Sequence, residues 1–241
     1  KKYKIRRYGF HGMSHKYVSK ETAKMLGVPY DQCKTIVCHL GNGASITAVK
    51  NGYSVDTSMG YTPLEGIIMG TRCGSIDPEI IHIITEKEGK TLGEVMNILN
   101  NKSGVYGLSD YLSSDVRDLS EAYFAGNPDA ERALNTYAYS IVKYIGAYAT
   151  VMDGADAISF TAGVGEHSAL VRRLVCDRLG FIGVKLDYDK NRNCDGAMEI
   201  SAPDSKIKVF VIPTDEEMSI AKQTAEQVKI KEDKMREDKR E

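Results

Sequence analysis

The sequence predicts a mixed α/β domain in which a sheet is flanked by helices. Two observations support this fold class: a hairpin-rich stretch lies between about residues 34 and 57, and helical patterns then alternate with short buried strands. The chain has 241 residues, 42% hydrophobic and 27% charged, the balance of a globular protein large enough for one substantial domain. No internal repeat is found.

The first elements are a helix and a meander of strands. A helix is expected from Ser14 to Gly27, because a glycine at that place is typical of a helix C-terminus. Asn51-Gly52 lies between two β-rich runs and is a strong hairpin signal, and the turn at 40–43 precedes it. An antiparallel meander is therefore expected over about 34–57, with strands at 34–39, 44–49 and 53–56.

Three helices are expected next. Asp77-Pro78 is a typical helix start and leads into 79–84. The Thr91-Leu-Gly-Glu94 sequence is a capping box that opens a helix to about Asn101. The longest helix begins after Asn127-Pro128 and ends at Gly154. Its apolar residues recur at helical spacing: Leu134, Tyr137, Ile141, Tyr144, Ile145, Tyr148 and Met152.

The remaining pattern alternates strand and helix. Residues 157–161 are expected as a buried strand that runs into a glycine loop and then a helix over about 168–179. Residues 207–212 form another expected strand, followed by a helix from Asp215. The segment 229–241 is almost entirely charged, which indicates a solvated or disordered tail and leaves 1–228 as the domain.

Composition narrows the function classes. A net charge of -1 gives no reason to expect nucleic acid or an acidic membrane as a partner, and no apolar run reaches the length of a membrane span. Five cysteines without a C-x-x-C pair favour a reduced, cytoplasmic setting over a zinc site. The chain opens on Lys1 without an initiator methionine, so we expect the interior of a longer protein cut at a domain boundary.

Two glycine-rich turns could hold an anion. In His39-Leu40-Gly41-Asn42-Gly43, glycines allow backbone N–H groups to approach a phosphate, although for this motif taken alone an ordinary hairpin is the better explanation, since hairpin glycines are common. In the second, glycines follow a buried strand and open into a helix, whose N-terminus favours phosphate; an ordinary βα turn is the alternative. The residues of this second turn are Gly163, Val164, Gly165, Glu166 and His167. Neither is a P-loop, since G-x-x-x-x-G-K-S/T is absent from the sequence.

Charged and imidazole side chains form the other candidates. Arg72 lies among glycines without a neighbouring carboxylate, which favours an anion ligand because its guanidinium fork matches phosphate oxygens. His11 could donate to an oxyanion or be a structural histidine. A metal site on His11 and His15 is disfavoured, since a helix that starts only at Ser14 would not present both rings on one face.

Two acidic segments remain open to interpretation. Glu216 follows an expected strand and could hold Mg²⁺, although acids in a helix's first turn are common for electrostatic reasons alone. Asp115, Val116 and Arg117 lie between helices and could bind a ribose or cap the next helix.

Taken together and in order, these motifs resemble the acetate kinase family over essentially the whole chain. The matching segments are RYGFHGMSHKYV, VCHLGNGASITAV, DTSMGYTPLEGIIMGTRCGSIDP, LSSDVRDL, FTAGVGEH and IPTDEEMSIA. The resemblance implies the actin-like, ribonuclease H-like ATPase fold and reversible phosphoryl transfer from ATP to acetate, giving acetyl phosphate and ADP. It also implies Mg²⁺ and a homodimer formed through this domain.

The resemblance also implies site roles. His11 and Arg72 would stabilise the transferring phosphoryl group, and Glu216 would serve Mg²⁺. Three segments would bind the nucleotide: 39–43 and 163–167 at its phosphates, and 115–117 at its adenosine side. The family's N-terminal domain, with its catalytic aspartate and carboxylate pocket, has no match here, so this chain alone is expected to bind nucleotide without turning over acetate.

Three other interpretations stay open at the level of sequence. A propionate or butyrate kinase would share these motifs, because the acid-selecting pocket lies largely in the unmatched domain. An actin-like ATPase module that forms no acyl phosphate is a second, although the pairing of Arg72 with His11 argues against it. The third is a purely dimerising domain, in which the tyrosine-rich stripe at 134–152 is partly a subunit interface instead of core.

Overall fold

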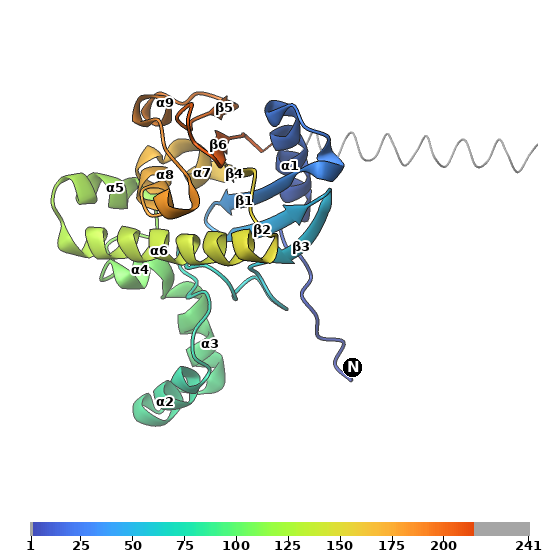
Figure 1. Ribbon diagram of the computed structural model, residues 1–241. Coiled ribbons are helices and arrows are strands. Elements are labelled where there is room, and N and C mark those ends of the chain that lie inside the picture. Colours follow the sequence, from blue (N-terminus) through green and yellow to red (C-terminus); the bar gives the residue numbers. More distant parts are fainter. Residues whose placement is uncertain (1, 215–241) are drawn as a thin grey trace, which may run out of the picture.

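The computed structural model describes residues 2–214, whose strands form one six-stranded mixed sheet (Figure 1). The sheet order is β3-β2-β1-β4-β6-β5. Strands β1, β2 and β3 pair antiparallel, as the meander predicted, whereas β1, β4 and β6 run parallel. The strand bounds are β1 Lys34–Leu40, β2 Ala44–Lys50, β3 Tyr53–Thr57, β4 Ala157–Thr161, β5 Met198–Glu199 and β6 Lys208–Val211.

Nine α-helices are found in the described residues. Their bounds are α1 Gly12–Leu26, α2 Glu79–Glu88, α3 Leu92–Asn101, α4 Gly104–Leu108, α5 Val116–Phe124, α6 Pro128–Val151, α7 Ala162–His167, α8 Ala169–Cys176 and α9 Tyr188–Arg192. None of them is long and apolar enough to cross a lipid bilayer. Local signals set several of these ends: Gly27 closes α1 at φ 70, and the Thr91–Glu94 capping box forms with both reciprocal hydrogen bonds.

The two faces of the sheet bury different residues, because side chains alternate along a strand. Ile36, Cys38 and Leu40 of β1 belong to the larger core with α6 and α8, while Val37 packs with Val18 of α1. The residue opposite His39 across the β1–β2 pair is Ser45. Directly opposite residues share a face, so His39 and Ser45 both point toward α1.

Helix α6 supplies one wall of the larger core. Its stripe residues are buried in the larger core, as the spacing predicted, with Tyr137 2% exposed and Tyr148 3% exposed, except Tyr144, which is half-buried. The buried residues of this stripe are therefore core, and their interpretation as a subunit interface is wrong. Asn127 caps the helix through its side chain, which accepts from the amides of Asp129 and Ala130.

Two of the differences from the expected elements bear on the site. Helix α1 begins at Gly12, two residues before Ser14, with His11 as its N-cap in the left-handed region at φ 58. The glycine loop after β4 is itself helical, as α7, before α8 starts at Ala169. The helix expected from Asp215 and the charged tail 229–241 lie outside the described residues.

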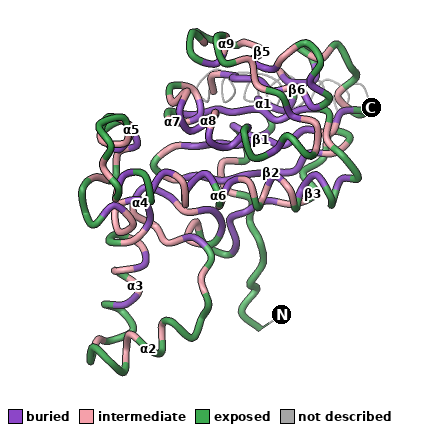
Figure 2. Tube along the Cα trace, turned by 60° about the vertical axis from the view of Figure 1, so that its left-hand side comes forward, coloured by how far each residue is buried: buried purple, intermediate pink, exposed green. Residues whose placement is uncertain are grey.

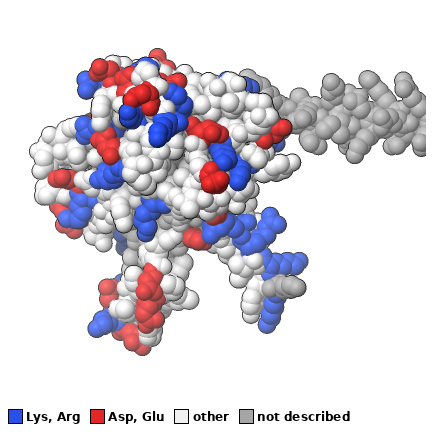
Figure 3. Space-filling model, in the orientation of Figure 1, with Lys and Arg blue, Asp and Glu red and all other residues white. Residues whose placement is uncertain are grey.

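Helices α2 and α3 form an arm that projects from the body, with α2 mostly exposed along its length (Figures 1 and 2). On the face shown in Figure 3, acidic side chains gather on this arm and basic ones on the segment that precedes α1. Elsewhere on that face both signs are interspersed. The arm also exposes apolar side chains, among them Ile80, Ile83 and Leu92.

Candidate functional site

Three histidines meet beneath the N-terminus of α1. His11 and His39 stack with ring centroids 4.0 Å apart and 17° between their planes, and the His15 centroid lies 6.0 Å from that of His39. His15 Nε2 and His11 Nδ1 both lie within hydrogen-bond distance of Ser45 Oγ, at 2.7 and 2.9 Å. Helix α1 starts two residues earlier than expected, and its N-terminal turn places both His11 and His15 at the Ser45 hydroxyl.

The cluster is largely buried, and burial keeps its inner rings neutral. Burial, followed by the influence of His11, lowers the pKa of His39 to about 3. The pKa of His15 also falls well below its usual value, chiefly through burial and then through His39 and His11. Ser14 Oγ lies 2.8 Å from His39 Nδ1 and fixes the orientation of that ring.

The Arg72 segment is held by the turn between α3 and α4. The amides of Val105 and Tyr106 donate to the carbonyls of Met69 and Gly70, at 2.9 and 3.0 Å. Gly104 lies in the left-handed region at φ 63, and a Cβ there would come within 2.2 Å of Met69 O. This packing admits only glycine at position 104 and fixes the backbone from which Arg72 extends.

Arg72 and His11 approach the same point of the β1–β2 turn. A Cβ built on Gly43 would lie 3.1 Å from Arg72 Nη1 and 3.9 Å from His11 Cε1. Arg72 Nη1 also donates to Pro63 O at 3.2 Å. A cation and an imidazole therefore flank Gly43, an arrangement suited to an anionic group.

The second glycine segment is helix α7, which follows β4 directly. Ala162, its first residue, lies in the left-handed region at φ 64, a strained conformation for alanine. A Cβ on Gly165 would lie 3.3 Å from the Phe160 carbonyl carbon and 3.6 Å from Cys38 O. Gly165 therefore lets α7 pack closely on the ends of β4 and β1.

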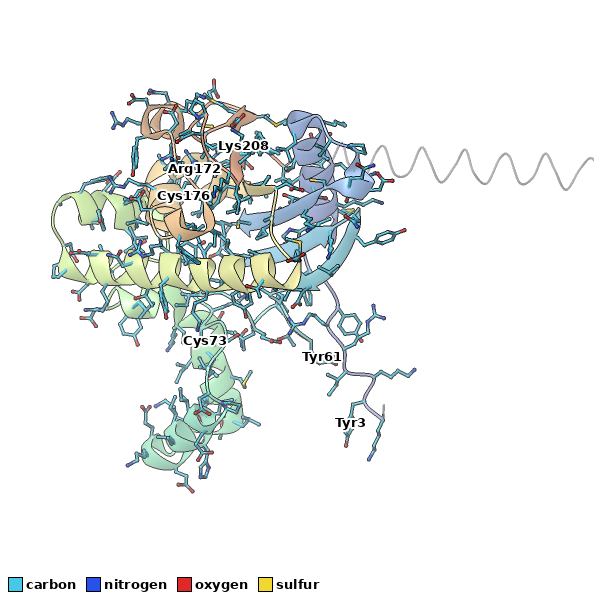
Figure 4. The ribbon with its side chains drawn as sticks, viewed as in Figure 1. Tyr3, Tyr61, Cys73, Arg172, Cys176 and Lys208 are labelled. Carbon is cyan, nitrogen blue, oxygen red and sulfur yellow. The ribbon has the colours of Figure 1, made fainter. Side chains whose placement is uncertain are left out.

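A buried arginine holds the far end of α7. Arg172 of α8 donates to the carbonyls of Gly165 and Glu166, at 2.9 and 2.7 Å, and to Oδ1 and O of Asn191, both at 2.7 Å. It is only 2% exposed, and burial lowers its pKa. Figure 4 shows Arg172 and Cys176 within the body of the domain. All four acceptors are neutral. Because two belong to α7 and two to α9, the guanidinium links these helices, and we call this link the Arg172 staple.

Asp115 caps α5 and faces an arginine. Its Oδ1 accepts from the Arg117 amide at 2.8 Å, and its Oδ2 lies 2.6 Å from Arg117 Nη2. The Arg117 hydrogen bonds hold the pKa of Asp115 below its usual value. The capping interpretation of this segment is thus met in the structure, and ribose binding is compatible with it, since Asp115 and Arg117 also line the cleft described next.

A cleft of about 1180 Å³ joins several of the predicted segments. The candidate residues that line it are Gly41, Asn42, Asp115, Val116, Arg117, Gly163, Val164 and His167. Gly70, next to the Arg72 segment, also lines it, and its amide donates to Asn42 O at 3.3 Å. Loops separated by more than 100 residues in sequence thus line one cleft.

Other candidate residues lie outside the cleft wall. The side chain of Leu40 is in the core, and that of His39 faces α1, so only their backbones could meet a ligand from this cleft. Gly165 contacts strand backbone, and the Glu166 carboxylate accepts from the Thr214 amide at 3.2 Å. Glu216 lies outside the described residues, within which no group of three or more His, Cys, Asp or Glu side chains is arranged to hold a metal ion.

One end of the cleft is apolar, and motif reasoning missed it. Tyr123 and Phe124 of α5 pack edge to face at 5.7 Å, and Phe124 is 70% exposed. Leu170, Leu174 and Tyr188 line the same cleft. Such a surface suits a flat aromatic ring. The adjacent aromatic pair that follows the Ser114–Asp118 segment was the available signal.

Comparison with known proteins gives one consistent result. The model of the Acetokinase family matches residues 1–222. The chain is 56% identical over 227 residues to an acetate kinase of Fervidobacterium nodosum, covering 94% of this chain and 56% of that protein. It is 57% identical over 227 residues to an acetate kinase of Thermotoga maritima, with 93% and 56% covered.

Solved structures agree in fold. A crystal structure of Porphyromonas gingivalis acetate kinase superposes with a TM-score of 0.89 at 46% identity, covering 93% of this chain and 56% of that one. A propionate kinase from Francisella tularensis gives 0.85 at 40% identity, with 91% and 56% covered. The expected ribonuclease H-like, actin-like ATPase fold is confirmed, and the chain spans about 56% of the length of the curated relatives it matches.

The chain belongs to the acetokinase family.

Proposed function

We propose that this acetokinase-family chain is the C-terminal, nucleotide-binding domain of an ATP:acetate phosphotransferase, which interconverts acetate and ATP with acetyl phosphate and ADP. One observation carries the proposal. Asn42 and Gly70 line one end of the cleft, and beside that end Arg72 and His11 flank Gly43. Phosphoryl transfer depends on positioning and on stabilising developing charge, and this arrangement supplies both.

The nucleotide lies along the cleft in this proposal. The adenine occupies the apolar end beside Phe124, and the ribose contacts Asp115 and Arg117 at the start of α5. The phosphates reach the 39–43 turn and the 163–167 segment, whose small residues Gly41 and Gly163 line the cleft and allow a close approach to the backbone. The transferring phosphoryl group then lies between Arg72 and His11, whose donors stabilise its charge.

Mg²⁺ would be bound together with the nucleotide, and Glu216 would supply a carboxylate for it. Support comes from the chemistry, since Mg²⁺ prefers a few carboxylates together with phosphate oxygens and retains several waters. We expect no tight site for Mg²⁺ alone, because one carboxylate is too few ligands. Calorimetry with Mg²⁺ and no nucleotide should give no binding heat, and a micromolar site would contradict this role.

Acetate is the proposed acceptor because the curated relatives quoted above, at 56 and 57% identity, are named acetate kinases, whereas the propionate kinase is 40% identical. Steady-state assays of the native protein that contains this sequence, with acetate and propionate side by side, separate the two acids. ATP hydrolysis without acyl phosphate formation would instead favour an actin-like ATPase module.

The protein is proposed to be cytoplasmic and to form a homodimer through this domain. Five unpaired cysteines favour a reducing compartment. The exposed apolar side chains of Ile80, Ile83 and Leu92 on the arm are the surface we assign to self-association. Light scattering of the wild type and of Ile83→Glu checks this: a shift from dimer to monomer is expected, and an unchanged mass would exclude the arm as the interface.

A glycine substitution tests nucleotide binding in the cleft. Gly163 lines the cleft, and a Cβ added there meets nothing within 4 Å, so Gly163→Leu should fill the cleft without straining the fold. We expect ADP affinity, measured by calorimetry, to fall at least about tenfold. Gly146→Leu on α6 is the matched control, because its Cβ also meets nothing and it does not line the cleft. Unchanged ADP binding by Gly163→Leu would refute the site.

A further inference from the structure

Ser45 forms a bridge between two histidines. Its hydroxyl oxygen lies 2.7 Å from His15 Nε2 and 2.9 Å from His11 Nδ1, and the side chain is fully buried at the start of β2. The strand register places Ser45 opposite His39, on the face covered by α1. The N-terminal turn of α1 therefore brings both rings onto one hydroxyl.

One hydroxyl carries one proton, which limits how the bridge can be arranged. If Ser45 donated to His15 Nε2, the proton of neutral His15 would be on Nδ1. That nitrogen is buried and has no hydrogen-bond partner among the described residues. A buried N–H without an acceptor costs about 1–3 kcal/mol, and such groups are rarer in proteins than unmet acceptors. The opposite arrangement, with His15 Nε2–H donating to Ser45, leaves only a lone pair unmet.

We propose that His15 and Ser45 are positioning residues that set the tautomer of His11. The His15 Nε2–H group donates to Ser45 Oγ, and the Ser45 hydroxyl donates to His11 Nδ1. His11 then carries its proton on Nε2. His15 is neutral in this bridge, in accord with the lowering of its pKa by burial.

We call the two hydrogen bonds, from His15 to Ser45 and from Ser45 to His11, the relay. Its direction determines whether His11 presents a donor or a lone pair to the site. The His11 ring turns its Cε1 edge toward the Gly43 turn, on which Arg72 also converges. With the proton on Nε2, neutral His11 is a hydrogen-bond donor to an anionic group, whereas the other tautomer would present a lone pair and repel it. This consequence rests on the proposed phosphotransferase function, while the tautomer assignment itself does not.

The histidine tautomers can be determined by NMR spectroscopy of the 241-residue chain. Two-bond ¹H–¹⁵N correlation spectra of ¹⁵N-histidine-labelled protein distinguish Nδ1–H from Nε2–H rings, and measurement near pH 8 keeps histidines with ordinary pKa values neutral. The chain has five histidines, so single Gln variants assign them. We expect the Nε2–H pattern for both His15 and His11. An Nδ1–H pattern for either ring in the wild type overturns the relay.

Substitution of the bridge gives a second readout. Ser45→Ala should turn His11 from a single Nε2–H form into a mixture of tautomers, and Ser45→Thr should restore the single form. Thr47→Val is the matched control: it removes another buried hydroxyl two residues along β2, which bonds to Thr57 and not to the histidines. A single Nε2–H form of His11 in folded Ser45→Ala would contradict the role of Ser45. If that variant does not fold, the wild-type spectrum decides alone.

Kinetic assays distinguish a failure of this inference from a failure of the proposed function. In the native protein, Ser45→Ala should lower kcat for phosphoryl transfer at least about tenfold with little change in KM for ATP. If the protein transfers no phosphoryl group, the spectra still test the relay. If the relay fails, ADP binding and transfer by the wild type are unaffected, so the two failures are distinguishable.

Discussion

Arg172 offers a sharp test of how α7 is held, because it is a buried cation whose partners are all neutral. Its guanidinium makes four hydrogen bonds: one each to the carbonyls of Gly165 and Glu166, and two to Asn191. Replacement by methionine keeps much of the apolar stem and removes every donor. The four acceptors then lose their partner in the interior.

The expected loss of stability follows from these bonds. Hydrogen bonds to a charged group contribute about 1.5–3 kcal/mol each, which gives about 6–12 kcal/mol for four. Burial of the guanidinium without a counter-charge offsets several kcal/mol of this. We therefore expect Arg172→Met to lower the free energy of unfolding by about 3–5 kcal/mol. ADP affinity should fall as well, because the bonds to Gly165 and Glu166 hold α7 beside the cleft.

Urea unfolding followed by circular dichroism measures the first effect, and calorimetry with ADP the second. Arg178→Met is the control: Arg178 is exposed and also makes two hydrogen bonds, to Leu174 O and Asn135 Oδ1, and its loss should change stability by less than about 1 kcal/mol. Equal losses for the two variants would refute the staple. If Arg172→Met does not fold, Arg172→Lys provides the measurement, since lysine keeps the charge and loses the fork.

Three further predictions concern Gly43, the buried histidines and the Thr91 capping box. Gly43→Ala should fold and bind ADP but lower kcat at least about tenfold in steady-state assays of the native protein, because its Cβ would come within 3.1 Å of Arg72 Nη1 and displace that side chain. The free energy of unfolding should rise by up to about 1.4 kcal/mol per pH unit for each of His15 and His39 between pH 4 and 6. In that range the unfolded rings bind protons that the folded rings, with lowered pKa values, do not. A pH series of urea titrations checks the slope, and His39→Gln should remove the contribution of His39 to it. Thr91→Ala should cost about 0.5–2 kcal/mol by breaking the capping box and leave ADP binding unchanged, as thermal melts and calorimetry can show.

Elements with local signals could be predicted from the sequence. Gly27, Asn51-Gly52 and the Thr91–Glu94 capping box each act through backbone geometry within a few residues, and all three appear as expected. The α7 helix could not be predicted in this way. Its two glycines lower helix propensity, and its stability depends on Arg172, which acts from the next helix.

The candidate site likewise combines residues that local signals indicated with features that depend on tertiary packing. Residue types and glycine spacing indicated Arg72, the 39–43 turn and the 163–167 segment. The bridge by Ser45 depends on the position of α1 over the sheet, which no local pattern specifies. The apolar end of the cleft likewise requires α5, α8 and α9 to line one cleft; the sequence indicated α5 only as a helix that the 115–117 segment could cap, and it did not indicate α9.

Strand β1 explains why the two halves of the site lie together. Its neighbour β4 runs parallel to it, so their carboxyl ends meet at one edge of the sheet, where the 39–43 turn and α7 begin. Alternation along β1 sends His39 toward the histidine cluster, while the carbonyl of the preceding residue, Cys38, lies 3.6 Å from the position of a Gly165 Cβ. That distance is an ordinary contact, but the same Cβ would lie only 3.3 Å from the Phe160 carbonyl carbon of β4, so a side chain at position 165 would have to shift α7 slightly from this edge. The histidines and the second glycine segment thus share one support, and a change at Gly165 should disturb the position of α7 before it disturbs the cluster.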